Sequence, residues 1–211
     1  LTYSKLVSKK LEKLNDRERY EDIIKILQLI SDESSRCGRI VKDLLHFSHQ
    51  DELQFMHSSI KEIIDRSIKL MSHHFQINNV KIKLDFKIDD IYLECDAQRI
   101  EQALIAILVN AVEAMPEGGT ITISVAKEFD NAVIRIIDEG KGIPPEVLPH
   151  IFEPFFTTKD KVKDTGLGLA VVYGIVQQHG GKVFVEQTSI KGTTFKISLP
   201  INHSKQNGKE A

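Results

Sequence analysis

The sequence is poor in cysteine and has no long apolar run. Among 211 residues there are two cysteines, Cys37 and Cys95, far apart in the chain. Two such cysteines provide neither a disulfide framework nor a four-sulfur zinc site, so a reducing compartment, the cytoplasm, is expected. The longest apolar run, residues 103–109, is much shorter than the about 20 residues that a membrane-spanning helix needs. We therefore expect no membrane segment in this chain, although a longer parent protein could be membrane-anchored.

The sequence also lacks an excess of positive or of negative charge. The chain has 28 Lys and Arg against 30 Asp and Glu, for a net charge of −2. Non-specific nucleic-acid binding depends on a positive field, so no nucleic-acid partner is expected. With 41% hydrophobic residues, 12 glycines and 6 prolines, the composition excludes wholesale disorder and collagen-like sequence. The length allows one large domain or two small ones.

Residues 1–50 are predicted to be helical because they contain no proline and one glycine. Apolar and small residues alternate at steps of four and three, a heptad pattern typical of bundled helices: Ile23, Leu27, Ile30, Ser34, Cys37, Val41, Leu44 and Ser48. The polar run at 15–19 separates this stripe from a looser one at 1–14. We predict an antiparallel helical hairpin that pairs with a second copy as a homodimeric four-helix bundle. Packing of the hairpin on its own chain is an equally supported alternative.

Residues 59–201 are predicted to form a second, mixed domain. Periodicity and turn residues predict helices over 60–75, 96–115 and 167–179, and strands over 82–88, 120–127, 132–137, 182–186 and 193–199. The elements are grouped and mostly antiparallel, which favours an α/β sandwich with helices on one face of a mixed sheet. The whole chain is then of the α+β class. Residues 51–58 are predicted to be a linker, and 202–211 a polar tail.

One long segment, residues 139–165, fits no helix or strand. It carries four prolines and, near its end, Phe152, Phe155 and Phe156. Loops of this length in compact domains are usually lids, binding loops or disordered segments. Three phenylalanines argue against disorder, and we predict a lid over about 143–165.

Two candidate sites involve side-chain oxygens. Asn110 lies in an otherwise apolar helix, where its amide is either a satisfied core group or an oxygen ligand for Mg²⁺. Glu113, one turn on, is either an exposed helix position or part of that site. Asp138 ends a predicted strand and precedes Gly140 and Gly142. Its carboxylate could accept the exocyclic amino group of adenine while the glycines let the base approach the backbone. Alone, this pattern is more often an ordinary turn.

Two further candidates suit phosphate. The run Asp164-Thr-Gly-Leu-Gly168 opens a predicted helix, where glycines expose backbone N–H groups at the positive end of the helix dipole. It is not a P-loop, because no Gly-Lys-Ser or Gly-Lys-Thr follows. The run 152–159 combines aromatic residues with a terminal Lys159, which either neutralises phosphate or is an ordinary surface lysine.

The order and spacing of these motifs resemble the catalytic domain of sensor histidine kinases. This domain belongs to a superfamily with DNA gyrase, the large heat-shock chaperone ATPase and the mismatch-repair ATPases. The matching runs are 110–114 for the N box, 138–142 for the G1 box (DxGxG), 152–156 for the F box, 165–169 for the G2 box and 191–195 for the closing Gly-Thr motif. The resemblance covers about residues 59–200. It implies the Bergerat-type ATP-binding fold, with ATP between the sheet-side turn and a mobile lid.

The resemblance also implies a set of site residues for Mg-ATP. Asn110 would hold Mg²⁺, and Asn110 and Lys159 would be the catalytic residues. The implied ATP-binding residues are Asn110, Glu113, Asp138, Gly140, Gly142, Ile143, Phe152, Lys159, Thr165, Gly166, Leu167, Gly168, Leu169 and Thr193.

The first 50 residues are similar to the family's dimerisation and histidine-phosphotransfer domain. Residues 39–48 resemble the end of its second helix, and residues 1–14 the rear of its first. This implies that the phosphoacceptor His lies upstream of Leu1 and that this chain does not phosphorylate itself. The implied function is transfer of the γ-phosphoryl of ATP to that His. The phosphoryl would pass next to an Asp of a response-regulator receiver domain, in two-component signal transduction.

Two positions depart from the family pattern. Four residues before Asn110 the ATPases carry Glu and the kinases usually Asn, but here the residue is Ala106. Without a base there, attack by water is poorly supported, which disfavours an ATPase. Loss of a polar group near Mg²⁺ keeps a nucleotide-binding pseudo-kinase as an alternative. Asp164 stands where the G2 box usually has Gly.

Overall fold

The computed structural model describes residues 23–31, 34, 53–88, 90–158 and 165–202. These residues fall into two compact units, which are treated separately below. The larger unit comprises the described residues of 51–154 and 168–211, and we call it the α/β unit. The smaller one comprises the described residues of 1–50 and 155–167.

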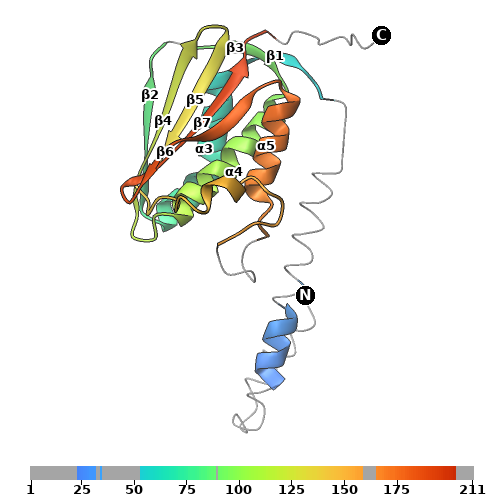
Figure 1. Ribbon diagram of the computed structural model, residues 1–211, viewed down its shortest axis with the longest axis vertical. Coiled ribbons are helices and arrows are strands. Elements are labelled where there is room, and N and C mark those ends of the chain that lie inside the picture. Colours follow the sequence, from blue (N-terminus) through green and yellow to red (C-terminus); the bar gives the residue numbers. More distant parts are fainter. Residues whose placement is uncertain (1–22, 32–33, 35–52, 89, 159–164, 203–211) are drawn as a thin grey trace. The chain divides into compact units, whose positions relative to one another are not determined.

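A five-stranded mixed sheet forms one layer of the α/β unit (Figure 1). Its order is β2 (Val80–Phe86), β4 (Gly119–Glu128), β5 (Asn131–Ile137), β7 (Gly192–Pro200) and β6 (Lys182–Ser189). The β2–β4 pair is parallel and the other three pairs are antiparallel. The predicted mixed sheet and the predicted hairpin of β4 and β5 are confirmed.

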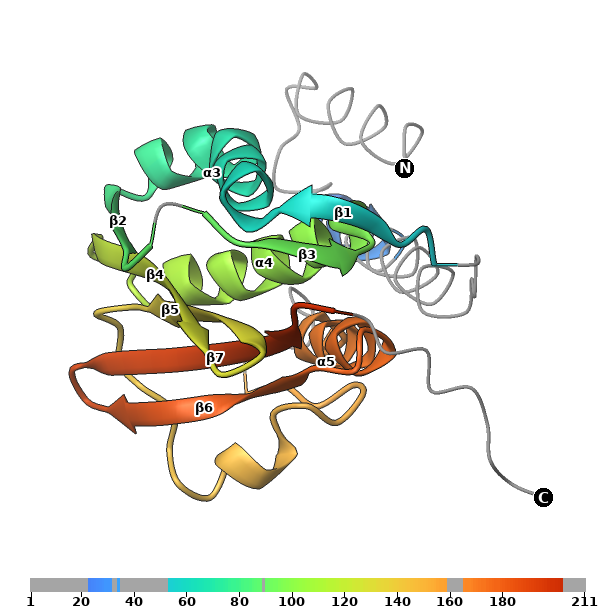
Figure 2. The same cartoon turned by 90° about the horizontal axis from the view of Figure 1, so that it is seen from above.

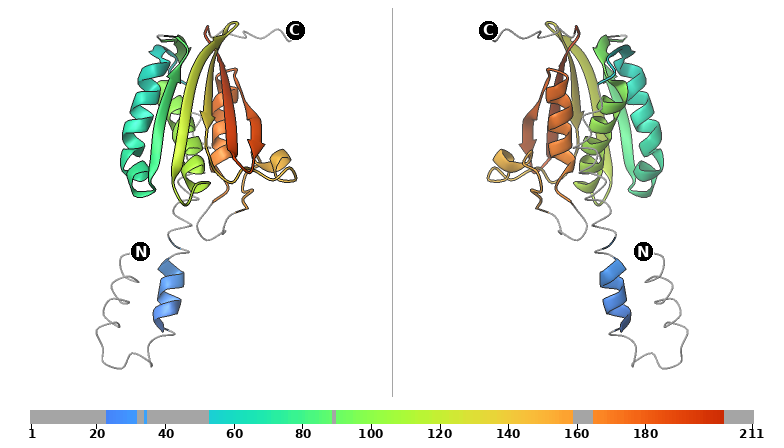
Figure 3. Two further views of the ribbon diagram at one scale, coloured as in Figure 1. Left: turned by 90° about the vertical axis from the view of Figure 1, so that its left-hand side faces the viewer. Right: turned by 90° about the vertical axis from the view of Figure 1, so that its right-hand side faces the viewer.

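Three helices cover one face of this sheet, as Figure 2 shows and as Figure 3 shows from two opposite sides. They are α3 (Ile60–Ile77), α4 (Ala97–Glu113) and α5 (Gly168–Gln178). The core lies between the two layers, where side chains of the helices meet the inward residues of the strands. Its largest fully buried members include Ile63, Leu104, Ile107, Ile121 and Ile134. The predicted fold class, an α/β sandwich with helices on one face, is confirmed.

The ends of α4 follow from its sequence. The Asp96 side chain caps the helix by accepting hydrogen bonds from the backbone N–H groups of Gln98 and Arg99, both at 3.1 Å, as predicted. The backbone N–H of Asp96 in turn donates to Nε2 of the buried His179 at 3.0 Å. Since Nε2 accepts, the imidazole proton is on Nδ1, which donates to the carbonyl of Ile175 at 2.8 Å. The end of α5 is thereby tied to the start of α4.

A small second sheet is the main element that the sequence did not reveal. Strand β1 (Met56–Ser59) pairs with β3 (Tyr92–Cys95), and β1 lies largely within the predicted linker at 51–58. Four-residue strands are too short to show a clear alternation. Ser59 also caps α3, since its hydroxyl oxygen accepts from the N–H of Glu62 at 3.0 Å. Another difference is that β6 runs on to Ser189 past an irregularity between Val185 and Gln187.

The opposite face of the sheet carries a charged cluster. Arg135 of β5 and Lys196 of β7 are opposite each other on neighbouring strands. Both contact Glu128 of β4 and Glu186 of β6. The Arg135 guanidinium contacts each carboxylate at 2.7 Å, and the Lys196 ammonium contacts them at 3.0 and 3.3 Å. We call these four residues the outer-face cluster.

In the smaller unit, residues 23–31 are helical. Ile23, Ile26, Leu29 and Ile30 of this segment are about half-exposed. The rest of the predicted helical hairpin, except residue 34, lies outside the described residues, as does most of the predicted polar tail. No helix in the described part of the chain is both long and apolar enough to cross a membrane.

Candidate functional site

The turn that follows β5 is built around the Asp138 carboxylate. Its Oδ1 accepts hydrogen bonds from the backbone N–H groups of Gly140 at 2.8 Å and Thr193 at 3.2 Å. The N–H of Asp138 donates to the Thr193 carbonyl at 3.0 Å, which extends the pairing of β5 and β7 by one residue. Asp138 is only 3% exposed. The turn therefore holds a buried carboxylate in a fixed orientation.

Burial raises the pKa of the Asp138 carboxyl above its ordinary value, and the hydrogen bonds from Gly140 and Thr193 offset part of this effect. The cause is the loss of hydration of the charged form. Since the folded-state pKa lies above the unfolded value, the folded state holds the proton of this carboxyl more tightly. The resulting contribution to stability is fully present at low pH, below the unfolded pKa. That contribution is lost as the pH rises through the raised pKa. The Asp138 carboxylate is thus kept at a cost in stability, which is common for functional groups.

Glycine is required at the turn because other backbone segments lie against it. A Cβ at Gly140 would stand 2.6 Å from Cβ of Ala114. Gly142 has φ +74°, and its Cβ would overlap the Ser189 carbonyl oxygen. A Cβ at Gly192, in the Gly-Thr motif, would overlap the carbonyl oxygen of Asp138. The motif residues 138–142 and 192–193 therefore belong to one closely packed structure.

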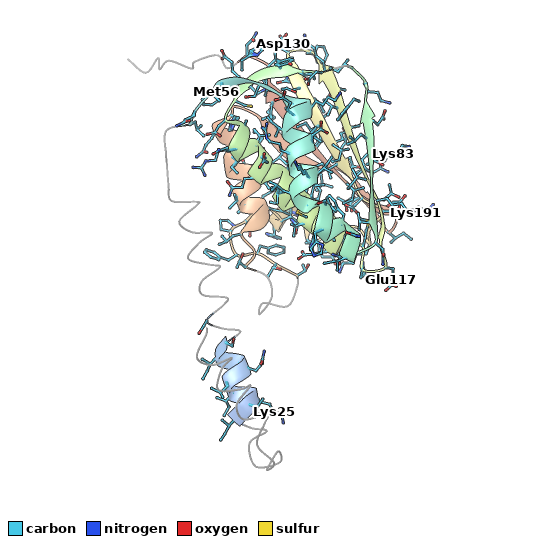
Figure 4. The ribbon with its side chains drawn as sticks, turned by 180° about the vertical axis from the view of Figure 1, so that it is seen from behind. Lys25, Met56, Lys83, Glu117, Asp130 and Lys191 are labelled. Carbon is cyan, nitrogen blue, oxygen red and sulfur yellow. The ribbon has the colours of Figure 1, made fainter. Side chains whose placement is uncertain are left out.

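The C-terminal turn of α4 is joined to the same turn. The N–H of Lys141 donates to the carbonyl of Ala114 at 3.2 Å, and Glu139 Oε2 accepts from the N–H of Thr120 at 2.8 Å. Asn110 lies one helical turn before Ala114 and is half-buried, whereas Glu113, the last residue of α4, is exposed. Figure 4 shows the labelled Glu117 and Lys191, from the α4–β4 and β6–β7 turns, at one end of the unit and Asp130 at the other.

Thr188 of β6 belongs to this site and was not predicted. Its hydroxyl oxygen accepts a hydrogen bond from the N–H of Ile143 at 2.8 Å and lies 3.3 Å from the hydroxyl oxygen of Thr193. Ile143 is the first residue of the predicted lid. A threonine in an edge strand is ordinary, so no pattern in the sequence distinguishes Thr188.

The described start of the predicted lid contains one short 3₁₀ helix, η1 (Leu148–His150). Nδ1 of His150 lies 2.8 Å from Glu153 Oε1. The ring of Phe152 packs against Tyr173 of α5, with centroids 5.8 Å apart and planes tilted by 41°. The first aromatic residue of the F box is therefore packed rather than free.

The G2 box is divided between the two units. Thr165, Gly166 and Leu167 belong to the smaller unit, and Gly168 and Leu169 begin α5 in the α/β unit. Gly166 has φ +66°, and a Cβ there would lie 2.6 Å from the carbonyl carbon of Phe155, so glycine is needed. A Cβ at Gly168 would meet nothing within 4 Å. Lys159 and Asp164 lie outside the described residues.

Asn110 is the predicted ligand for a magnesium ion. Within the described ranges, no group of three or more His, Cys, Asp or Glu side chains is placed to hold a metal ion. Mg²⁺ commonly takes one or two protein ligands and completes its octahedron with phosphates and water. Asn110, half-buried one helical turn before Ala114, has the amide oxygen that such a role requires.

This combination of fold and turn defines a class of ATP-binding domain. Residues 95–203 match the model of the HATPase_c family, described as "Histidine kinase-, DNA gyrase B-, and HSP90-like ATPase". The crystallised catalytic domain of the histidine kinase ThkA is 31% identical to this chain with a TM-score of 0.65. The match covers 71% of this chain and 97% of that one.

The chain belongs to the HATPase_c family, and its α/β unit is a catalytic domain of the histidine kinase type. Sporulation kinase A of Bacillus subtilis (strain 168) is 35% identical over 188 residues, which are 89% of this chain but 30% of that kinase. The structure of ThkA in complex with the response regulator protein TrrA is 29% identical with a TM-score of 0.74. That match covers 97% of this chain and 58% of that one. The predicted family is confirmed, and the roles of single residues remain predictions.

Proposed function

We propose that this chain binds Mg-ATP and presents its γ-phosphoryl to a histidine of the helical phosphotransfer domain. The observation that carries the proposal is the buried Asp138 carboxylate. Its two hydrogen bonds from other residues of the described chain both end at Oδ1. Oδ2 is then the acceptor for the exocyclic amino group of adenine. Gly140 and Gly142 let the base lie against the backbone, and Thr193 completes this side of the pocket.

The remaining site residues act on the phosphates and on the walls of the pocket. Asn110 would hold Mg²⁺, which neutralises phosphate charge when it is bound. The N–H groups of Gly166 and Gly168 would bind phosphate oxygens, and Thr165, Leu167 and Leu169 would be further ATP-binding residues. Lys159 would neutralise the phosphoryl group in transfer. Glu113, Ile143 and Phe152 would line the rest of the pocket. Catalysis of this kind depends on positioning and electrostatics.

The helical region would supply the dimer and the partners. The half-exposed apolar side chains of residues 23–31 support pairing of residues 1–50 with a second copy, because such side chains on a helix face favour a packed neighbour. The relative solved with a response regulator supports a receiver domain as the partner for onward transfer. We place the phosphoacceptor His upstream of Leu1.

Ala106 distinguishes the kinase from the ATPase alternative. It lies on α4 one turn before Asn110, is partly buried and packs against the core. It provides no base for water at the position where the ATPases carry one, so hydrolysis would be slow. A pseudo-kinase would bind the same nucleotide without transferring phosphate.

The test compares this chain with a longer form that carries the segment upstream of Leu1, both incubated with Mg²⁺ and γ-labelled ATP. We expect acid-labile, alkali-stable label on the longer protein alone. Free labelled phosphate from both forms, with no labelled protein, would establish the ATPase instead. Bound nucleotide with neither product would establish the pseudo-kinase.

A further inference from the structure

The first residue of the lid is held by a side chain that belongs to no motif. The N–H of Ile143 donates to Thr188 Oγ1 at 2.8 Å. Just before it, Gly142 lies so close to the hairpin that its Cβ would overlap the Ser189 carbonyl oxygen. The lid therefore leaves the domain from a point fixed against the end of β6.

The same hydroxyl reaches the adenine side of the site. Thr188 Oγ1 lies 3.3 Å from Thr193 Oγ1, and the N–H of Thr193 donates to Asp138 Oδ1 at 3.2 Å. Asp138, Thr193, Thr188 and Ile143 thus form a continuous series of contacts. Thr188 is the one member that touches both the Gly-Thr motif and the lid.

We propose that Thr188 is a positioning residue for nucleotide binding, which couples the orientation of Asp138 and Thr193 to the position of the lid's first residue. The inference rests on the proposed ATP-binding function. A hydroxyl suits this task because it accepts from the Ile143 N–H and also exchanges a hydrogen bond with the second hydroxyl. Removal of the acceptor leaves a half-buried backbone N–H without its partner and releases the root of the lid.

The experiment substitutes Thr188→Val, which keeps the branched shape suited to a strand and removes the hydroxyl. Thr188→Ser keeps the hydroxyl and removes the methyl group. Thr122→Val is the matched control, because Thr122 lies on β4 of the same sheet and its hydroxyl makes no hydrogen bond among the described residues. Two readouts are taken on the whole chain: amide hydrogen exchange at Ile143 without nucleotide, and the Kd for Mg-ATP by calorimetry.

For Thr188→Val we expect the rate of amide exchange at Ile143 to rise. The Kd for Mg-ATP should rise by about tenfold, which corresponds to the free energy of one lost hydrogen bond. Thr188→Ser should restore both values, and Thr122→Val should change neither. The melting temperature should move little in all three, since Thr188 lies half-buried at the end of an edge strand and the half-buried Ile143 N–H can bond to water once the hydroxyl is gone.

Wild-type affinity and wild-type exchange in Thr188→Val would overturn the proposal. A weakened Kd that Thr188→Ser does not restore, together with a lower melting temperature, would also overturn it in favour of a purely structural role. Failure of the wild-type chain to bind ATP would refute the proposed function. The exchange rate at Ile143 would then still report whether Thr188 fixes the lid.

Discussion

One carboxylate of the α/β unit, Asp138, lies in surroundings opposite to those of two others, Glu128 and Glu186. Asp138 is buried at the end of β5, and burial raises the pKa of its carboxyl. Glu128 and Glu186 lie on the outer face of the same sheet, where hydrogen bonds from Arg135, and then from Lys196, lower the pKa of each. The same strand, β5, supplies Arg135 to one set and leads into Asp138.

The outer-face cluster is therefore expected to contribute to stability, and Asp138 to function. The outer-face cluster pairs each carboxylate with cations, so ionisation of these carboxylates favours folding. Ionised Asp138 is instead held by backbone N–H groups at a cost, which a ligand that donates to it can recover. We therefore expect changes at Asp138 to affect nucleotide binding, and changes in the outer-face cluster to affect the free energy of unfolding.

The largest effect is expected from Asp138→Asn. The amide oxygen can still accept from Gly140 and Thr193, but the amide nitrogen presents a donor to the amino group of adenine. We expect the Kd for Mg-ATP to rise at least about 100-fold, from loss of a charged hydrogen bond and an unpaired donor. Calorimetry measures the Kd, and thermal unfolding at pH 7 should show equal or higher stability because a buried charge is gone. Asp130→Asn, in the exposed β4–β5 turn, is the control and should leave binding unchanged.

Gly192→Ala tests the packing that holds Asp138 in place. Gly192 has φ +131°, and a Cβ would overlap the Asp138 carbonyl oxygen. We expect the free energy of unfolding to fall by about 2 kcal/mol, with weaker nucleotide binding, as measured by urea unfolding and calorimetry. Gly174→Ala is the matched control, because a Cβ there meets nothing within 4 Å. In the middle of α5 that change should stabilise the protein by about 0.5–1 kcal/mol. Equal effects of the two substitutions would contradict this account of the turn.

Arg135→Met should act on stability alone. It removes one of the two cations that contact both Glu128 and Glu186, while Lys196 remains, and it keeps an unbranched apolar stem. We expect urea unfolding to show a loss of about 1 kcal/mol, the upper end for partly exposed ion pairs. The Kd for Mg-ATP should stay at the wild-type value. A large change in the Kd would show that Asp138 is coupled to the outer-face cluster.

The smallest expected effect is the pH dependence of the stability that Arg135→Met loses. The pKa values of Glu128 and Glu186 are lowered in the folded state, so their contribution is present above the unfolded pKa and disappears as the pH falls through the folded pKa. The difference in unfolding free energy between wild type and Arg135→Met should therefore shrink below about pH 4. A difference that stays constant from pH 7 to pH 3 would contradict the assignment to carboxylates.

Periodicity predicted most of the α/β unit from the sequence. The three helices and the five strands of the main sheet repeat their apolar residues often enough to be recognised, and Asp96 marked the start of α4. Strands β1 and β3 were missed because four residues show no clear period.

The candidate site was predicted where it consists of glycines and a carboxylate at fixed spacing. Asp138, Gly140 and Thr193 were assigned by motif, and the structure brings them together. Thr188 could not be predicted, because the role proposed for it depends on a contact with Ile143, which lies 45 positions earlier in the chain. The contact forms only in the folded chain, and no local pattern records it.

The most direct test of the central claim is whether the chain distinguishes the amino group of adenine. Calorimetric titrations of Mg-ATP and Mg-ITP into the wild-type chain measure this, because ITP has a carbonyl oxygen where ATP has the amino group. The account predicts that ATP binds at least about 100-fold more tightly, since a buried carboxylate facing a carbonyl leaves two acceptors unpaired. Equal affinities for the two nucleotides would contradict the role assigned to Asp138.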